Sequence, residues 1–227
     1  KDIAALGFDG ILVTIRGVWP DDGKERKLTD PMHGRAGEAR PISIRQADFS
    51  RARRIVSKMV KEDGLSKSML RVGLTTKNRI GWRDDEAWAV AADNLAFLAE
   101  FARDTGLVGI AFDEEDYSNG RQFFKVEGDP DGAELAALVR KRGRQVFEAI
   151  FRAYPDVTFH SSWLFSTIQK WHAWVTPEFG LDQAAATESH GELWGYFMNG
   201  AIDAMPPDAT IVEGNEERGY HGNANRN

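Results

Sequence analysis

Short apolar runs alternate with amphipathic helical patterns along this chain, and the alternation constrains its fold more than any other feature. Apolar runs typical of β-strands predict strands at residues 8–15, 68–76, 106–112, 157–165 and 209–217. Apolar residues at helical spacing predict helices at 47–64, 84–106, 129–156 and 190–205. Strands that alternate with helices are usually parallel and joined by right-handed crossovers. The sequence therefore predicts an α/β protein built on a parallel sheet.

Two parallel architectures fit this alternation, a doubly wound open sheet and a (β/α)8 TIM-type barrel. No glycine-rich phosphate loop follows any predicted strand, which counts against a nucleotide-binding sheet and favours the barrel. A full barrel needs about eight strands, so the five visible here suggest an incomplete barrel or irregular further strands. Residues 1–227 are expected to form one barrel domain or barrel fragment. Its long polar loop at 16–45 would lie on the face where barrels place their active sites.

Composition excludes several classes of partner and cofactor. The 227 residues carry a formal net charge of -6 and show no basic stripe, so nucleic acid is not an expected partner. No apolar segment approaches the roughly 20 residues of a membrane-spanning helix. The chain has no cysteine, which excludes disulfides, thiolate zinc sites and cysteine nucleophiles. No cofactor is predicted, and the oligomeric state is left open.

The third predicted strand ends in a cluster of acids, in the segment GLVGIAFDEEDY at residues 106–117. Side chains alternate along a strand, so Ile110 and Phe112 share one side and are expected to pack against helices. Asp113 and Glu115 then share the other side. They lie at the carboxyl end of the strand, where a parallel barrel opens.

Two carboxylates in these positions have the chemistry of a glycosidase. Asp113 and Glu115 are two residues apart on one side of a strand, so their Cα atoms should be about 6 to 7 Å apart. Mutual repulsion raises the pKa of one carboxyl group, which places a protonated acid beside an ionised carboxylate, as glycoside cleavage requires. The alternative interpretation is an acidic loop that is solvated or caps the next helix.

Other strand ends supply further candidate residues. Glu213 follows an apolar strand in the same way and is the candidate for the partner carboxylate. The candidate substrate-binding residues are Arg16, Trp19, Tyr117, His160 and Trp163. Several tryptophans near strand ends favour a sugar cleft, although each one taken singly is more often a packing residue. Arg16 can equally pair with an acid of the cluster, and His160 can be a hydrogen-bonded core group.

The segment GIAFDEEDY resembles the strand-four motif of family 18 glycoside hydrolases, the chitinase-like barrels. That motif runs Gly-hydrophobic-Asp-hydrophobic-Asp-x-Glu, often followed by Tyr, and it aligns here with residues 109–117 only. By this resemblance, Glu115 would be the general acid and Asp113 would orient the substrate amide. Ala111 replaces an acid of the motif, which argues against substrate-assisted chemistry on N-acetyl sugars. The resemblance implies a glycoside-hydrolase-like barrel rather than membership of one family.

The leading hypothesis is a glycoside hydrolase that cleaves a poly- or oligosaccharide by carboxylate acid/base chemistry. Glu115 or Asp113 would protonate the leaving oxygen, and the partner carboxylate would be Glu213 or an acid outside this chain. A spacing of about 5 Å between the catalytic carboxylates would imply retention, and a wider spacing would imply inversion. No signal peptide is visible, yet polysaccharide degradation would favour a secreted or periplasmic location.

Two other functions stay open at this stage. In a metal-dependent sugar isomerase, oxygen and nitrogen ligands from several strand ends would hold a divalent ion. The candidate ligands would be Glu115, Asp113, His160 and Glu213. They form no compact ligand motif, and no metal site is predicted. In a non-catalytic carbohydrate-binding protein, the acids would only hydrogen-bond sugar hydroxyls.

Overall fold

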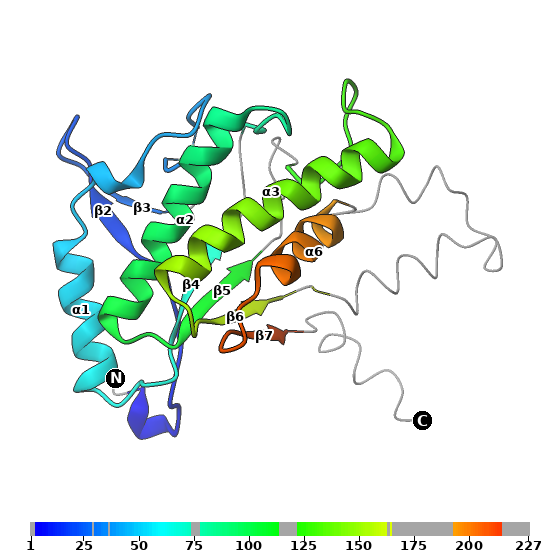
Figure 1. Cartoon of the computed structure of the whole chain (residues 1–227). Helices are drawn as coiled ribbons and strands as arrows, with labels where there is room; N and C mark the ends of the chain where they lie inside the picture. The colour runs from blue at the N-terminus through cyan, green and yellow to red at the C-terminus, as the bar shows by residue number, and fades with distance from the viewer. Residues whose placement is uncertain are drawn as a thin grey trace, which may run out of the picture.

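The architecture is a five-stranded parallel sheet with helices in its connections. The computed structural model describes residues 3–28, 30–35, 37–73, 78–113, 122–162, 164 and 193–214 (Figure 1). In their order across the sheet, the strands are β1 (Leu12–Val13), β4 (Met69–Gly73), β5 (Gly109–Asp113), β6 (Thr158–Ser161) and β7 (Thr210–Glu213). Every neighbouring pair is parallel. The prediction of an α/β protein with a parallel sheet is confirmed.

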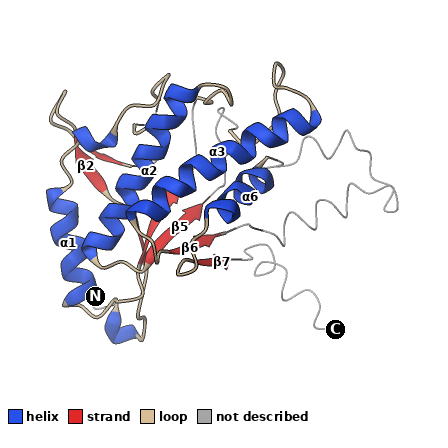
Figure 2. Cartoon of the chain, in the orientation of Figure 1, coloured by secondary structure: helices blue, strands red, loops and turns tan. Residues whose placement is uncertain are grey.

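Among the described residues, an α-helix lies in each connection between successive strands of this sheet. These helices are α1 (Ser50–Lys61), α2 (Asp85–Thr105), α3 (Gly132–Ala153) and α6 (Trp194–Ala204). Figure 2 shows α2, α3 and α6 on one side of the sheet. Strand order across the sheet follows chain order without a reversal, whereas a doubly wound sheet reverses its order and carries helices on both faces. None of the described helices is both long and apolar enough to cross a membrane.

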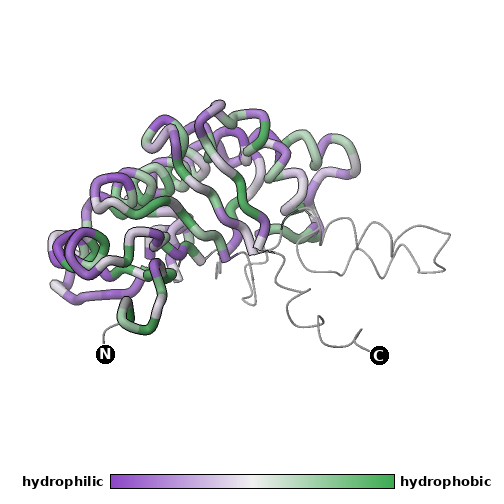
Figure 3. Tube along the Cα trace, turned by 90° about the horizontal axis from the view of Figure 1, so that it is seen from below, coloured by the Kyte–Doolittle hydropathy of each residue, from purple (hydrophilic) through white to green (hydrophobic). Residues whose placement is uncertain are grey.

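The space between the sheet and its helices is filled by aromatic and aliphatic side chains. Ile110 and Phe112 of β5 are at most 1% exposed. The ring of Phe112 lies 6.1 Å from that of Phe147 in α3 and 4.7 Å from that of Phe159 in β6. The prediction that Ile110 and Phe112 face the helices is therefore confirmed. Figure 3 shows that hydrophobic and hydrophilic stretches alternate along the trace.

Helix α2 begins and ends close to where the sequence predicts, whereas α3 begins later. Asp84 caps α2 by accepting a hydrogen bond from the Ala87 N–H at 3.0 Å, and Gly106 ends it with a φ of 83°. The sequence pattern placed the cap of α3 at Asp129. Arg79 instead donates to both carboxylate oxygens of Asp129, at 2.8 and 2.7 Å, and the helix starts at Gly132.

The segment 16–45, predicted to be a long loop, contains regular structure of its own. The strands β2 (Arg16–Val18) and β3 (Glu25–Lys27) form a separate antiparallel pair. The first predicted strand, at 8–15, is consequently reduced to the two residues of β1, because the chain soon enters β2. Two 3-10 helices, η1 (Ala4–Leu6) and η2 (Ile44–Gln46), complete the N-terminal region.

The end of the segment 16–45 is hydrogen-bonded to α2 through the side-chain amide of Asn94. Asn94 of α2 is fully buried; its side chain donates to the Ile42 carbonyl and accepts from the Ile44 N–H, both at 2.9 Å. One side chain thus satisfies the N–H of the buried Ile44 and the carbonyl of the half-buried Ile42.

Candidate functional site

A cavity of about 430 Å³ lies at the carboxyl ends of the central strands. Its lining residues are Leu12, Arg71, Ala111, Phe112, Asp113, His160, Ser162 and Gly214. The carboxyl ends of parallel strands are where α/β proteins usually bind their ligands. This cavity is therefore the candidate functional site.

The strand register explains why polar side chains gather there. Arg71 of β4, Ala111 of β5 and His160 of β6 are directly paired across the sheet, so their side chains share one face. Phe112, the next residue along β5, faces the helices, so the Arg71–Ala111–His160 row faces the opposite side of the sheet. Asp113 lies two residues beyond Ala111 and shares that face. The methyl group of Ala111 leaves space between two long side chains.

Arg71 and Asp113 form an ion pair across neighbouring strands. The guanidinium Nη2 donates to Asp113 Oδ2, and the two side chains are 40% and 18% exposed, respectively. The sequence analysis named Asp113 and missed Arg71. The available signal was a charged residue inside the apolar run MLRVG, but pairing Arg71 with Asp113 requires the register between strands far apart in sequence.

His160 lies against Gly214, the residue that follows β7. A Cβ atom at Gly214 would lie 2.8 Å from both Cε1 and Nε2 of the His160 ring. Only glycine leaves room for this ring position without a shift. The structure thus places the sequence-predicted His160 on the wall of the cavity, beside Asp113 and Arg71.

Glu213, the candidate partner carboxylate, is not brought to the same face as Asp113. In the register of the sheet, Glu213 pairs with Ser161, which pairs with Phe112. Side chains of paired residues share a face, so Glu213 has the orientation of the helix-facing Phe112. The register thus gives Glu213 the opposite parity to Asp113, and the role of Glu213 as partner carboxylate stays a prediction.

Arg16 and Trp19 lie outside the cavity lining. Arg16 is exposed in β2, where it pairs with Lys27 of β3. Trp19 is 3% exposed, with the guanidinium of Arg35 lying 5.4 Å from its ring centroid. The ring of Trp19 is buried in this structure, which is the packing role that the sequence analysis gave as the alternative, and its role in substrate binding stays a prediction.

Three sequence-predicted site residues, Glu115, Tyr117 and Trp163, lie outside the described residues. Within the described ranges, no group of three or more His, Cys, Asp and Glu side chains is arranged to hold a metal ion. The described part of the site therefore consists of an arginine–aspartate pair, a histidine and small residues.

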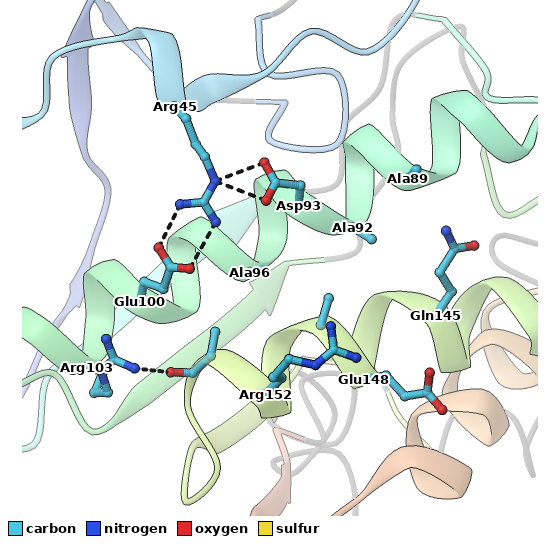
Figure 4. A pocket seen from close by; sticks show the side chains of 12 residues that line it. Arg45, Ala89, Ala92, Asp93, Ala96, Glu100, Arg103, Gln145, Glu148 and Arg152 are labelled. Atoms are coloured by element: carbon cyan, nitrogen blue, oxygen red, sulfur yellow. Dashed lines mark hydrogen bonds and ion pairs between the residues drawn. The ribbon is translucent and has the colours of Figure 1, made fainter.

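A second hollow, of about 580 Å³, lies between α2 and α3 (Figure 4). Alanines of both helices line it, and Arg45 donates at its rim to Asp93 and Glu100. Hydrogen bonds from Arg45, first to Glu100 and then to Asp93, raise its pKa above the ordinary arginine value. Although it is larger than the strand-end cavity, this hollow lies on the helix layer, and Arg45 at its rim is paired with the surface acids Asp93 and Glu100. We therefore assign the candidate site to the strand ends.

Fold and site together define an α/β protein with a charged cavity at the carboxyl ends of a parallel sheet. A scan against protein-family models found no match. Searches of curated proteins and of solved structures likewise found no match. A functional assignment must accordingly rest on the chemistry of the cavity.

Proposed function

We propose that the five strands belong to a (β/α)8-type barrel and that the protein hydrolyses glycosidic bonds at the carboxyl ends of those strands. The barrel proposal is supported by strand order, since the sheet runs β1-β4-β5-β6-β7 without a reversal. The helices drawn in front of the sheet in Figure 2 are also consistent with a barrel wall, which carries its helices on the outside.

The enzymatic proposal rests on one observation: Arg71, Asp113 and His160 line the same cavity. Each comes from a different neighbouring strand, and all three have the parity opposite to the aromatic core. In a closed barrel that parity faces the interior, where catalytic side chains at the carboxyl ends meet the substrate. An apolar sheet surface with no function would not need a charged row there.

The ion pair suggests that Asp113 and Glu115 have different roles in the reaction. A guanidinium in contact with a carboxylate favours its ionised form. Asp113 is therefore better suited to stabilise positive charge or to act as a nucleophile than to donate a proton. Glu115 remains the predicted general acid, from its sequence parity and its resemblance to the chitinase-like motif.

The test is hydrolysis of a polysaccharide panel by the purified protein, read as released reducing ends. Glu115→Gln should lower turnover by about a hundredfold or more, because an acid/base group contributes on that scale. Asp113→Asn should also lower turnover by about a hundredfold or more, because it removes a charge that stabilises the transition state. Asp203→Asn is the matched control, since Asp203 also pairs with an arginine, Arg140, but lies on the surface and does not line the cavity.

Melting curves of all variants would show whether each one is folded. Full activity in a folded Asp113→Asn or Glu115→Gln variant would contradict the assigned roles. Binding of saccharides without hydrolysis of any of them would replace the proposal with a carbohydrate-binding function.

A further inference from the structure

Arg71 and Asp113 meet diagonally across two neighbouring strands. The register pairs Arg71 of β4 with Ala111 of β5, and it pairs Asp113 with Gly73. From the spacing of strands and the rise of two residues, the Cα atoms of Arg71 and Asp113 are about 8 Å apart, a distance that an arginine side chain can span. Gly73 has no side chain to stand between them. The register and the glycine at position 73 together allow the contact.

The Asp113 carboxylate is the less accessible member of this pair. Its side chain is 18% exposed, whereas that of Arg71 is 40% exposed. Arg71 Nη2 donates to Asp113 Oδ2, and among the described residues Arg71 is the cation in contact with this carboxylate. A carboxylate that is largely removed from water is stable as an anion only when hydrogen bonds and positive charge compensate it. Arg71 contributes both from the neighbouring strand.

A contact of this kind also restricts where the carboxylate oxygens point. The second torsion of an aspartate side chain has a broad energy minimum, so the carboxylate of an unpaired aspartate samples a range of orientations. A charge-assisted hydrogen bond narrows that range. Arg71 and Asp113 line the same cavity, so the restricted carboxylate is one that a ligand would meet. A misplacement of about 1 Å at a reacting group can cost a hundredfold in rate.

We infer that Arg71 is a positioning residue, which holds the Asp113 carboxylate in place for glycoside cleavage and does not itself contact the reacting atoms. The inference rests on the proposed function and assigns a role to a residue that the sequence analysis missed. Two effects follow from this role. Loss of Arg71 changes the state of the Asp113 carboxylate, and that change slows the chemical step.

Steady-state kinetics on a polysaccharide that the parent hydrolyses test the effect on the chemical step. Arg71→Met removes the guanidinium and keeps an apolar stem. It should lower kcat by about tenfold or more and change KM by less than about threefold, because a positioning residue acts on the transition state and not on substrate binding. Arg71→Lys should recover part of kcat, since it restores the charge without the planar fork. Arg140→Met is the matched control and should match the parent, because Arg140 pairs with Asp203 on the surface and does not line the cavity.

A double-mutant cycle with Asp113→Asn shows whether Arg71 acts through Asp113. If it does, adding Arg71→Met to the Asp113→Asn variant should lower kcat by less than about twofold, because no carboxylate is left to position. Two effects that multiply would show that Arg71 acts independently of Asp113, which would overturn the inference. Melting curves show whether each variant is folded.

The effect on the carboxylate can be measured whether or not the protein hydrolyses a saccharide. The Cγ NMR signal of Asp113 follows the protonation of its carboxyl group. In Arg71→Met, Asp113 should take up its proton at a pH about one unit higher than in the parent, because a neighbouring cation lowers the pKa of a carboxyl group on that scale. His160 also lines the cavity and titrates, but it is present in both proteins, so the difference between them reports on Arg71.

The outcomes distinguish this inference from the proposed function. Where the parent hydrolyses a polysaccharide, full activity of a folded Arg71→Met variant overturns the positioning role and keeps the glycosidase. A rise in KM with kcat unchanged does the same, because Arg71 would then bind substrate directly. An unchanged titration of Asp113 in Arg71→Met also overturns the positioning role. A shifted titration in a protein that hydrolyses no polysaccharide supports the action of Arg71 on Asp113 and defeats the glycosidase proposal.

Discussion

Arg142 shows how this chain accommodates a single charge inside its core. Its side chain is 2% exposed, and its guanidinium donates to the Trp82 carbonyl at 2.9 Å, to Gln145 at 2.9 Å and to Asp85 at 2.6 Å. It also lies 5.9 Å from the ring centroid of Trp88. A buried arginine is tolerable only when it is hydrogen-bonded and paired. Asp85 supplies the charge from the solvent-exposed first turn of α2.

That pairing predicts an acid-dependent contribution to stability. Hydrogen bonds from Arg142, and next from Lys141, lower the pKa of Asp85 below its ordinary value. Such a group stabilises the fold above its unfolded pKa of about 4 and loses this effect as pH falls through the lowered folded pKa. Asp85→Asn should therefore lower the urea midpoint at neutral pH. The difference from the parent should shrink as pH falls below about 4.

Urea unfolding followed by circular dichroism across this pH range checks the expectation. Glu127→Gln is the control, because Glu127 is exposed and forms no ion pair within the described residues. Its curves should follow those of the parent protein at every pH. A difference in urea midpoint between Asp85→Asn and the parent that stays constant below about pH 4 would show that the stabilisation does not come from the ionised Asp85.

At the candidate site, local sequence predicts which face of the sheet a strand residue lies on. It does not predict which residues of neighbouring strands that residue contacts. The two-residue period of β5 predicted that Asp113 lies opposite Ile110 and Phe112, because alternation is a property of the strand itself. The ion pair with Arg71 was not predictable, since it depends on the register of β4 against β5. The same limitation affects Glu213, whose position after an apolar run does not fix its parity. Trp19 resembled an exposed loop residue because the burial of the 16–45 segment is a tertiary effect.

At the scale of secondary-structure elements, two glycines lie where α3 packs closely against α6. A Cβ atom at Gly143 would lie 1.9 Å from the Phe197 carbonyl oxygen. At Gly200 it would lie 2.2 Å from the Arg140 carbonyl oxygen. Both obstacles are backbone atoms, which cannot move aside as a flexible side chain can. The two glycines therefore set how closely the helices approach.

Gly143→Ala should destabilise the protein even though alanine is the better helix former. The clash must separate α3 from α6, and overpacking of this kind typically costs about 1 to 3 kcal/mol. That cost exceeds the gain of about 1 kcal/mol in helix propensity. Gly81→Ala is the matched control, because nothing lies within 4 Å of a Cβ there. Chemical denaturation of both variants tests this; a Gly143→Ala variant as stable as Gly81→Ala would show that the helices can adjust.

A substitution at Asn94 tests whether its hydrogen bonds hold the 16–45 segment against α2. Asn94→Leu keeps a similar volume but removes the partner of the buried Ile44 N–H and of the half-buried Ile42 carbonyl. Each unsatisfied group costs about 1 to 3 kcal/mol, so we expect a loss of roughly 2 to 6 kcal/mol in unfolding free energy. Limited proteolysis should cut more quickly near η2 than in the parent protein.

Asn94→Asp is the partner variant, because its carboxylate can still accept from Ile44 N–H but cannot donate to Ile42. It should lie between the parent and Asn94→Leu in protease resistance. Equal resistance of all three proteins would mean that the amide does not hold the segment in place.

At the scale of the whole molecule, the order of strands and helices was predictable and the shape of the N-terminal region was not. Period-two and period-3.6 patterns are local, so the sequence located all five strands of the sheet and the helices between them. Parallel pairing followed, because each connection is long enough to contain a helix. The β2–β3 pair was missed because its strands are polar and only three residues each, with no apolar alternation to mark them.

Successive residues of one strand lie on opposite faces of the sheet, so different contacts restrict which side chain each position can hold. Along β5, the ring of Phe112 packs in the aromatic core, whereas the side chains of Ala111 and Asp113 lie on the opposite face of the sheet. Substitutions at the β5 positions on the cavity face could therefore change which ligand the protein binds. The β5 positions on the helix face would meanwhile keep the core packed. A lineage carrying this sheet would be free to explore new ligands without first rebuilding its interior.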